Sequence, residues 1–306
     1  MSHSISRRFK IIVLSFVVLS LTTYFGISAY MASILTQTER NQITSTPKES
    51  GLAYEDISFP SHEDSLQLKG WFIPAPAGSR VIILVHGKAF HRANPEIGML
   101  EIAGSLVKNG YNILMFDLRG WGESEGNRFS LGYFEQRDLK GAIQYLKGRG
   151  FHAGQIGIMG WSMGAAIAMI TAGTTPVAAI VEDSGYADLA ELLEVQIPQR
   201  SGLPNIFNFG IVNMVHFMYG ANLYSLRPAE SVSQITNGRI FVIHGEADDI
   251  VPVEHARRIF AVKANQKGNE MWLLPGIGHI SAYKTFPTEY IKRVAAFFDR
   301  ELIRTQ

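Results

Sequence analysis

The sequence contains no cysteine, and this absence excludes several kinds of chemistry. Without a thiol there is no disulfide, no thiolate metal site, no cysteine nucleophile and no lipid anchor attached to cysteine. Net charge is also nearly missing, because 28 Lys and Arg against 27 Asp and Glu give +1 at pH 7. Nucleic-acid binding needs a concentrated basic face. We therefore expect no nucleic-acid partner.

Internal repeats and low-complexity tracts are absent as well. Hydrophobic residues make up 46% of the 306 residues and charged residues 18%, which provides enough apolar material for a core and no compositional sign of disorder. Single α/β domains commonly exceed about 200 residues. We therefore expect one large domain with an appendage.

Charge is missing altogether between Ile11 and Leu35. About 20 apolar residues are enough to cross the hydrocarbon core of a bilayer, so we predict a transmembrane anchor over residues 11–35. The residues just before it include Arg7, Arg8 and Lys10. Because basic residues favour the cytoplasmic side, we expect residues 1–10 to form a cytoplasmic tail and the remaining chain to lie on the extracytoplasmic side.

A cleaved signal peptide would begin with the same pattern of basic residues and an apolar run. Its cleavage site needs two small residues separated by one position. At that spacing Ala29 follows Ile27, and Ala32 follows Tyr30. We therefore favour an uncleaved single-pass cell-membrane anchor over secretion after cleavage.

Residues 36–52 are polar and contain Pro47 and Gly51, a composition typical of an exposed linker. Beyond it, short apolar runs alternate with amphipathic segments. The runs that predict strands are 53–59, 66–73, 81–85, 112–116, 156–159, 177–181, 240–243 and 271–274. The segments that predict helices are 97–107, 134–146, 165–172, 256–262 and 290–302. A hairpin followed by alternating strands and helices indicates a doubly wound α/β domain over residues 53–304.

The five residues Gly160-Trp161-Ser162-Met163-Gly164 match the pattern G-x-S-x-G. They lie between a predicted strand and an alanine-rich predicted helix, where this pattern forms a sharp turn that exposes the serine. The turn also puts Ser162 at a helix N-terminus, with the backbone N–H of Met163 directed at a developing oxyanion. We predict that Ser162 is a nucleophile.

Further landmarks follow other predicted strands in a fixed order. They are His86-Gly87, the run from Asp117 to Ser124 with the pattern D-x-R-G-x-G-x-S, the run from His244 to Asp248, and Gly278-His279. With these motifs the chain resembles the α/β-hydrolase superfamily over about residues 53–304, particularly its serine aminopeptidase-like and monoacylglycerol lipase-like esterase group. The resemblance implies a mostly parallel eight-stranded sheet with helices on both faces and a helical cap.

An un-ionised serine hydroxyl needs a neighbouring base, and His279 is the best candidate. It lies in a glycine-containing loop after the last predicted strand and fits the chain order serine, acid, histidine. His86 and His244 each precede a glycine at the end of a buried strand, where we expect the ring to bond to nearby backbone.

The third triad member is a carboxylate that orients the histidine. Asp248 matches the H-G-x-x-D pattern of the family. The alternative acid is Asp183, because some relatives of this fold supply the acid from the preceding strand. Asp117 lies in a turn, where we expect it to pair with Arg119 or with backbone groups.

The oxyanion hole needs a second backbone N–H, which the family supplies from the residue after His-Gly. That residue is Lys88, although this chain lacks the H-G-G-G run found in better-known patterns. Its side chain is then free to be solvated or to meet an anionic substrate group.

An insertion at residues 186–228 is the expected cap. Two helices are predicted there, 187–197 and 205–219, separated by Pro198, Gly202 and Pro204. The second is apolar nearly all round, which indicates a helix buried on several sides or one that faces a ligand or a membrane. We take it as a wall of an apolar acyl pocket, with packing against the main domain as the alternative.

These residues predict a serine hydrolase that cleaves carboxylic esters through an acyl-serine intermediate and needs neither metal nor organic cofactor. The partners are then a small-molecule ester or acyl substrate and the membrane, and the sequence carries no signal for an oligomeric state. Peptidase, amidase or thioesterase activity would use the same three residues. A non-catalytic, membrane-tethered binding protein of the same fold is the remaining alternative.

Overall fold

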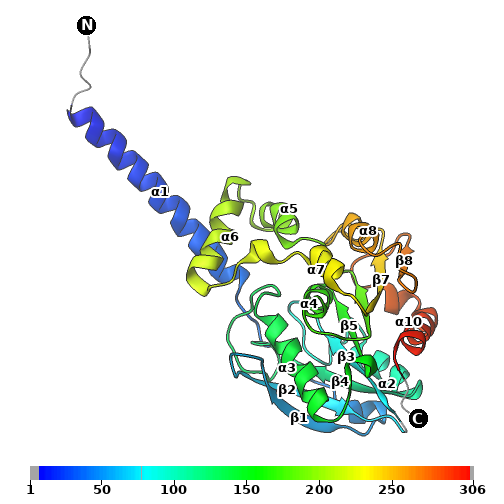
Figure 1. Cartoon of the computed structure of the whole chain (residues 1–306). Coiled ribbons are helices and arrows are strands. Elements are labelled where there is room, and N and C mark those ends of the chain that lie inside the picture. Colours follow the sequence, from blue (N-terminus) through cyan, green and yellow to red (C-terminus); the bar gives the residue numbers. More distant parts are fainter. Residues whose placement is uncertain (1–6, 77, 304–306) are drawn as a thin grey trace.

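A mixed sheet of eight strands runs through the computed structural model, which describes residues 7–76 and 78–303 (Figure 1). The strands in chain order are β1 (Glu55–Pro60), β2 (Gln67–Ile73), β3 (Arg80–Val85), β4 (Tyr111–Phe116), β5 (Ile156–Trp161), β6 (Ala179–Asp183), β7 (Arg239–Gly245) and β8 (Glu270–Leu274). Their order across the sheet is β1-β2-β4-β3-β5-β6-β7-β8. The first two strands form the predicted antiparallel hairpin, β2 pairs antiparallel with β4, and all later pairs are parallel.

Strand β6 differs from its predicted range of 177–181, because it continues to Asp183. The pattern of apolar residues ends at Val181, whereas the strand includes two buried carboxylic acids, Glu182 and Asp183. Hydrophobicity alone therefore places the strand two residues too early where the sheet carries polar side chains into the interior.

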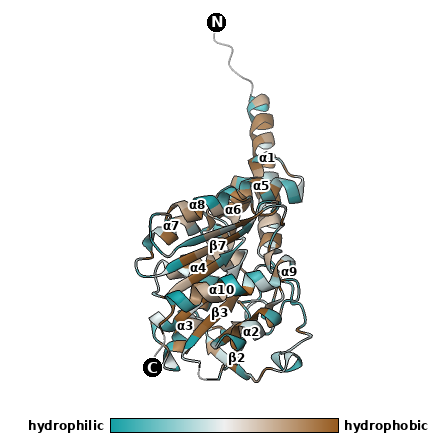
Figure 2. Cartoon of the chain, turned by 90° about the vertical axis from the view of Figure 1, so that its right-hand side faces the viewer, coloured by the Kyte–Doolittle hydropathy of each residue, from teal (hydrophilic) through white to brown (hydrophobic). Residues whose placement is uncertain are grey.

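Helices cover both faces of the sheet and divide the core into two clusters. One face carries α2 (Met99–Lys108), α10 (Pro287–Glu301) and the short α9 (Ala282–Thr285). The other carries α3 (Glu135–Gly148), α4 (Met163–Ala172), α7 (Pro228–Gln234) and α8 (Glu254–Ala261). Figure 2 shows hydrophobic residues concentrated on the central strands that these helices cover. The doubly wound arrangement is the one predicted from the alternating strands and helices.

The 186–228 insertion between β6 and β7 contains α5 (Leu189–Ser201) and α6 (Ile206–Tyr219). Pro198 lies inside α5, so its expected position in a connecting loop was wrong. Proline lacks the N–H that would bond to the carbonyl four residues earlier. The side-chain amide of Asn208 donates to that carbonyl, of Glu194, at 3.0 Å. A contact between the two helices thus satisfies the group that Pro198 leaves unpaired.

Most residues of the predicted linker, 36–52, are exposed, and the segment lies along the domain. Gln37 forms an isolated antiparallel bridge with Arg128, and Arg40 donates to the backbone carbonyl of Gly122 at 2.9 Å. Polar composition predicted the exposure but not these contacts with the domain.

Helix α1 (Arg7–Leu35) has 29 residues and a mean hydropathy of 2.1 in its most apolar window, of which 6% is buried. By length and composition it is suited to be a membrane span or a signal sequence. The helix includes Arg7, Arg8 and Lys10 from the predicted tail, whereas residues 1–6 lie outside the described residues.

Most of α1 projects away from the domain, but its C-terminal part packs against α6 (Figure 1). The rings of Tyr24 and Phe207 stack with centroids 5.1 Å apart, and the Tyr24 hydroxyl donates to the carbonyl of Ile206 at 2.8 Å. The two helices approach closely at Gly210, where a side chain would collide with Ser28 and Tyr24. Packing against α6 therefore fixes the angle at which α1 leaves the domain.

Replacing Gly210 by Val should force the two helices apart. Overpacking of this kind costs about 1–3 kcal/mol, which corresponds to a fall in melting temperature of roughly 2–12 °C for a chain of this size. The measurement is thermal unfolding of the full chain in detergent. Gly26→Val is the matched control, because a side chain at this α1 position meets no atom within 4 Å. Equal melting temperatures for the two variants would contradict the close packing.

Candidate active site

Ser162 occupies a strained turn between β5 and α4. Its backbone has φ 54° and ψ −119°, a conformation that residues with a side chain rarely adopt. The turn is held because the Ser162 N–H donates to the carbonyl of Asp183 at 2.8 Å. A side chain at Gly160 would collide with the backbone of Gly164, and one at Gly164 with the carbonyl of Val85. The two glycines therefore allow the close backbone approach that exposes Ser162.

The structure brings Ser162, His279 and Asp248 into one hydrogen-bonded chain. The Ser162 Oγ lies 2.9 Å from His279 Nε2, and His279 Nδ1 lies 2.7 Å from Asp248 Oδ2. These side chains come from three separate connections, after β5, β8 and β7. Because parallel strands end at the same edge of the sheet, their following loops converge there. The geometry suits proton transfer from a serine hydroxyl to an oriented imidazole.

Asp248 is held as a carboxylate by the groups around it. Its Oδ1 accepts the backbone N–H groups of Ile250 and Val251 at 2.9 and 2.8 Å, and its Oδ2 lies 3.3 Å from His244 Nε2. Burial opposes the charge, but hydrogen bonds with His244 and His279 hold the pKa of Asp248 well below its usual range. The carboxyl is therefore ionised at neutral pH.

Asp183, the alternative acid, points to other partners. It accepts hydrogen bonds from the hydroxyls of Tyr290 at 2.7 Å and Ser184 at 2.8 Å. Burial raises the pKa of this carboxyl, while these two hydrogen bonds lower it. Since His279 bonds to Asp248, Asp183 has a different place in the site, beneath the loop that carries the histidine.

Ser184 links Asp183 to that loop. The Ser184 Oγ accepts the backbone N–H of Ile280 at 3.1 Å, next to His279. Sequence reasoning missed both Ser184 and Tyr290. Ser184 directly follows a parallel strand, and polar residues at such strand ends are the available signal. No short sequence motif marks Tyr290, which lies on α10 and contacts Asp183.

The loop after β3 is fixed by His86. Its Nε2 accepts the backbone N–H of Leu118 at 3.0 Å, and its Nδ1 donates to the carbonyl of Gly87 at 2.8 Å. Burial lowers the pKa of His86 to about 4, so the ring is neutral at neutral pH. His244 likewise bonds to backbone, with Nε2 2.8 Å from the carbonyl of Val251. Both contacts match the backbone roles expected for these histidines.

Asp117 contacts the same loop after β3, but its charged partner is not the expected Arg119. It accepts the backbone N–H of Arg92 at 2.7 Å and forms an ion pair with the guanidinium of Arg92. Arg119 instead pairs with buried Asp138, at 2.6 Å. The pairing with Arg119 was therefore wrong, whereas the expected backbone contact is present. Proximity in sequence favoured Arg119, but the β3 loop brings Arg92 to the carboxylate.

Lys88, at the turn of this loop, places its side chain beside an aromatic ring. Its Nζ lies 5.3 Å from the centroid of the Phe129 ring, and burial together with the charge of Arg200 lowers its pKa. The Lys88 backbone N–H makes no hydrogen bond to another residue within 7–76 and 78–303. Met163 begins α4, and N–H groups of a first helical turn have no intrahelical acceptor.

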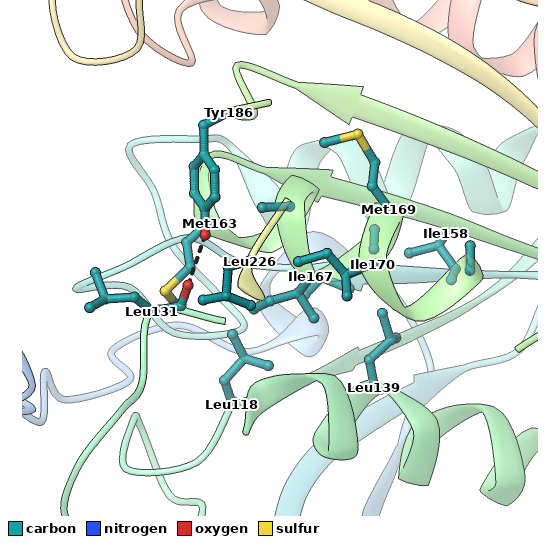
Figure 3. Packing of buried hydrophobic residues seen from close by; sticks show 14 of the residues in the cluster. Leu118, Leu131, Leu139, Ile158, Met163, Ile167, Met169, Ile170, Tyr186 and Leu226 are labelled. Atoms are coloured by element: carbon teal, nitrogen blue, oxygen red, sulfur yellow. Dashed lines mark hydrogen bonds between the residues drawn. The ribbon is translucent and has the colours of Figure 1, made fainter. Parts of the chain in front are cut away.

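A cavity of about 220 Å³ lies over Ser162 and His279. Its other lining residues are Lys88, Ala89, Phe90, Leu131, Met163, Tyr186, Leu189, Leu192, Leu193, Gln196, Arg200, Ile250 and Val251. Figure 3 shows Tyr186 bonded through its hydroxyl to the carbonyl of Leu131, at 2.8 Å, with Met163 close by. Helix α5 supplies much of the wall, so the insertion covers the site.

The chain matches the model of the prolyl oligopeptidase family over residues 101–304. It is similar to YqkD, an uncharacterised protein of Bacillus subtilis, with 27% identity over 236 residues that cover 76% of this chain and 75% of YqkD. It is also similar to the lysophosphatidylserine lipase ABHD12 of Danio rerio, with 26% identity over 222 residues, which are 67% of this chain and 55% of ABHD12.

Among solved structures, the chain is similar to the esterase Pf2001 of Pyrococcus furiosus. The TM-score is 0.72 and the identity 26%, and the match covers 87% of this chain and 99% of the esterase. This likeness confirms the predicted α/β-hydrolase fold.

Proposed function

The chain belongs to the prolyl oligopeptidase family and is a serine hydrolase, and from this premise we propose that it cleaves carboxylic esters with apolar acyl groups at a membrane. The observation that carries the proposal is the chain of hydrogen bonds from Ser162 through His279 to Asp248 beneath a mostly apolar cavity. Apolar walls with a few convergent polar groups are typical of small-molecule sites.

In the proposed reaction the Ser162 Oγ attacks the ester carbonyl while His279 Nε2 takes the hydroxyl proton. Asp248 orients the imidazole and stabilises its positive charge. The backbone N–H groups of Met163 and Lys88 stabilise the oxyanion. His279 then returns the proton to the leaving alcohol, and the same residue activates the water that releases the acid from the acyl-serine.

The acid role is assigned to Asp248 and not to Asp183. The support is the 2.7 Å contact between Asp248 and His279, together with two backbone N–H groups that keep the carboxylate charged. Asp183 bonds to Tyr290 and Ser184 instead. This arrangement makes Asp183 a positioning residue for the turn at Ser162 and for the histidine loop.

Ester hydrolysis is favoured over peptide hydrolysis by the lining of the cavity. Among the described residues that line it, the charged side chains are Lys88 and Arg200, and no carboxylate faces the space to bind a peptide amino terminus. Likeness to the Pyrococcus esterase supports the same choice. Similarity to a lysophosphatidylserine lipase further supports an acyl ester as substrate.

For the chain as a whole we propose a cytoplasmic tail at 1–10, an anchor at 11–35, a linker at 36–52 and a catalytic domain at 53–304 with a cap at 186–228. Retention of α1 is supported by its packing, because Ala32 is fully buried in the main core cluster and Ser28 is fully buried as well. Cleavage within α1 would remove part of the surface that covers α6.

The serine assignment predicts that Ser162→Ala abolishes covalent labelling by a fluorophosphonate probe. Hydrolysis of a short-chain nitrophenyl ester should fall by roughly 10⁴-fold or more, because the attacking group is gone. Ser233→Ala, at an exposed position of α7, is the control and should retain both signals. Full labelling of the Ser162 variant would refute the assignment.

The choice of acid predicts unequal effects for two matched substitutions. Asp248→Asn should lower kcat by about 10⁴-fold, because an amide favours the wrong tautomer of His279. Asp183→Asn should cost less than about tenfold, since the amide oxygen can still accept from Tyr290. Steady-state kinetics with both variants decide between them. A larger loss for the Asp183 variant would transfer the acid role to that residue.

The proposed topology can be tested by cysteine labelling, because the parent chain contributes no background. A cysteine replacing exposed Glu254 on α8 should react with a membrane-impermeant maleimide in intact cells. A cysteine replacing Ser4 should react only after permeabilisation. The opposite pattern would mean that the catalytic domain is cytoplasmic.

A further inference from the structure

A second apolar cavity, of about 210 Å³, lies beside the one over Ser162. The two share the lining residues Lys88, Leu131, Leu193, Gln196 and Arg200, so they adjoin each other across these side chains. The second cavity is also lined by Met31, Ile34 and Leu35, which belong to α1. Together the two cavities therefore occupy the space between the reactive serine and the N-terminal helix.

We propose that these three residues of α1 form a wall of the acyl-binding site, so that a membrane lipid with a single acyl chain reaches Ser162 along α1. The inference rests on the proposed esterase function and adds to it the substrate class and the route of entry. In this view α1 is part of the substrate site and is more than a tether.

The size of the two cavities favours one acyl chain. Each is smaller than the roughly 300–1,000 Å³ typical of sites for drug-sized ligands, and five side chains line both. A slender chain fits such a shape, whereas a lipid with two chains is too broad. Lys88 and Arg200 line both cavities, and the long hydrocarbon stem of exposed Arg200 can cover an apolar chain while its guanidinium stays in water.

The length of α1 places the cavity near the surface of a bilayer. A helix of 29 residues is about 43 Å long at 1.5 Å per residue, whereas the hydrocarbon core is about 30 Å thick. The C-terminal end of α1 therefore extends beyond the hydrocarbon core. That end carries Met31, Ile34 and Leu35, which line the cavity.

Helix α6 presents further apolar surface beside α1. Ile206, Phe209 and Phe217 are 69%, 68% and 82% exposed. Large apolar side chains that are exposed together mark contact with a membrane or a partner. Because α6 packs directly against a helix long enough to span a bilayer, the lipid surface is the partner that the geometry supplies. The entrance would then open toward lipid and not toward bulk water.

The test uses the full chain in phospholipid nanodiscs with two probes, nitrophenyl palmitate and water-soluble nitrophenyl acetate. Met31→Trp should obstruct the cavity and lower the palmitate-to-acetate ratio of kcat/KM at least tenfold. Met31→Ala should enlarge the cavity and raise that ratio. Leu14→Trp is the control, because this α1 residue is 63% exposed and lies far from the cavity lining; its ratio should stay within twofold of the parent.

A palmitate-to-acetate ratio that is unchanged in both Met31→Trp and Met31→Ala overturns the wall assigned to α1. Fluorophosphonate labelling of Ser162 distinguishes this failure from failure of the esterase proposal. If the parent and both variants are labelled equally while the ratios are unaltered, the serine hydrolase stands and only the entry route is wrong. If the parent chain is not labelled at all, both the proposed function and the proposed entry route are wrong.

Discussion

The site depends on a close backbone approach at the turn between β5 and α4. Ser162 is held at positive φ because its N–H bonds to the carbonyl of Asp183 and because Gly160 and Gly164 have no side chains to collide with the surrounding backbone. Strain at one residue is tolerated where the neighbouring structure fixes it from several sides. Here the fixed groups are the ends of β5 and β6 and the first turn of α4, so the sheet and its covering helix together hold the hydroxyl in place.

Buried polar contacts extend this constraint to the rest of the site. Asp183 joins the turn to Tyr290 on α10 and, through Ser184, to the loop that carries His279. Such networks are favourable only when their members find partners, since an unpaired buried polar group is costly. The histidine loop is therefore positioned by groups from three separate segments. The insertion covers the cavity above it, and α1 lines the adjoining cavity.

Several differences between prediction and structure have one cause. Pro198 remains helical because Asn208 bonds to the carbonyl that proline leaves free, and Asp117 pairs with Arg92 because two loops meet at the end of the sheet. The 36–52 segment lies along the domain for a similar reason, since Arg40 finds acceptors on a distant turn. Local sequence rules give each residue its intrinsic preference, whereas these outcomes depend on partners that are remote along the chain.

Local pattern alone determined the element order, the sharp turn at Ser162, the apolar N-terminal helix and the candidate nucleophile and base, Ser162 and His279. Each follows from hydrophobic periodicity or from short motifs, in which nearby residues supply the physical cause. Only the tertiary structure decided which carboxylate meets His279 and that α1 borders the cavity. Both of these outcomes depend on distances between segments that are far apart in the sequence, and no local conformational preference encodes such a distance. The convergence of the strand ends and the packing of α1 against α6 set these distances.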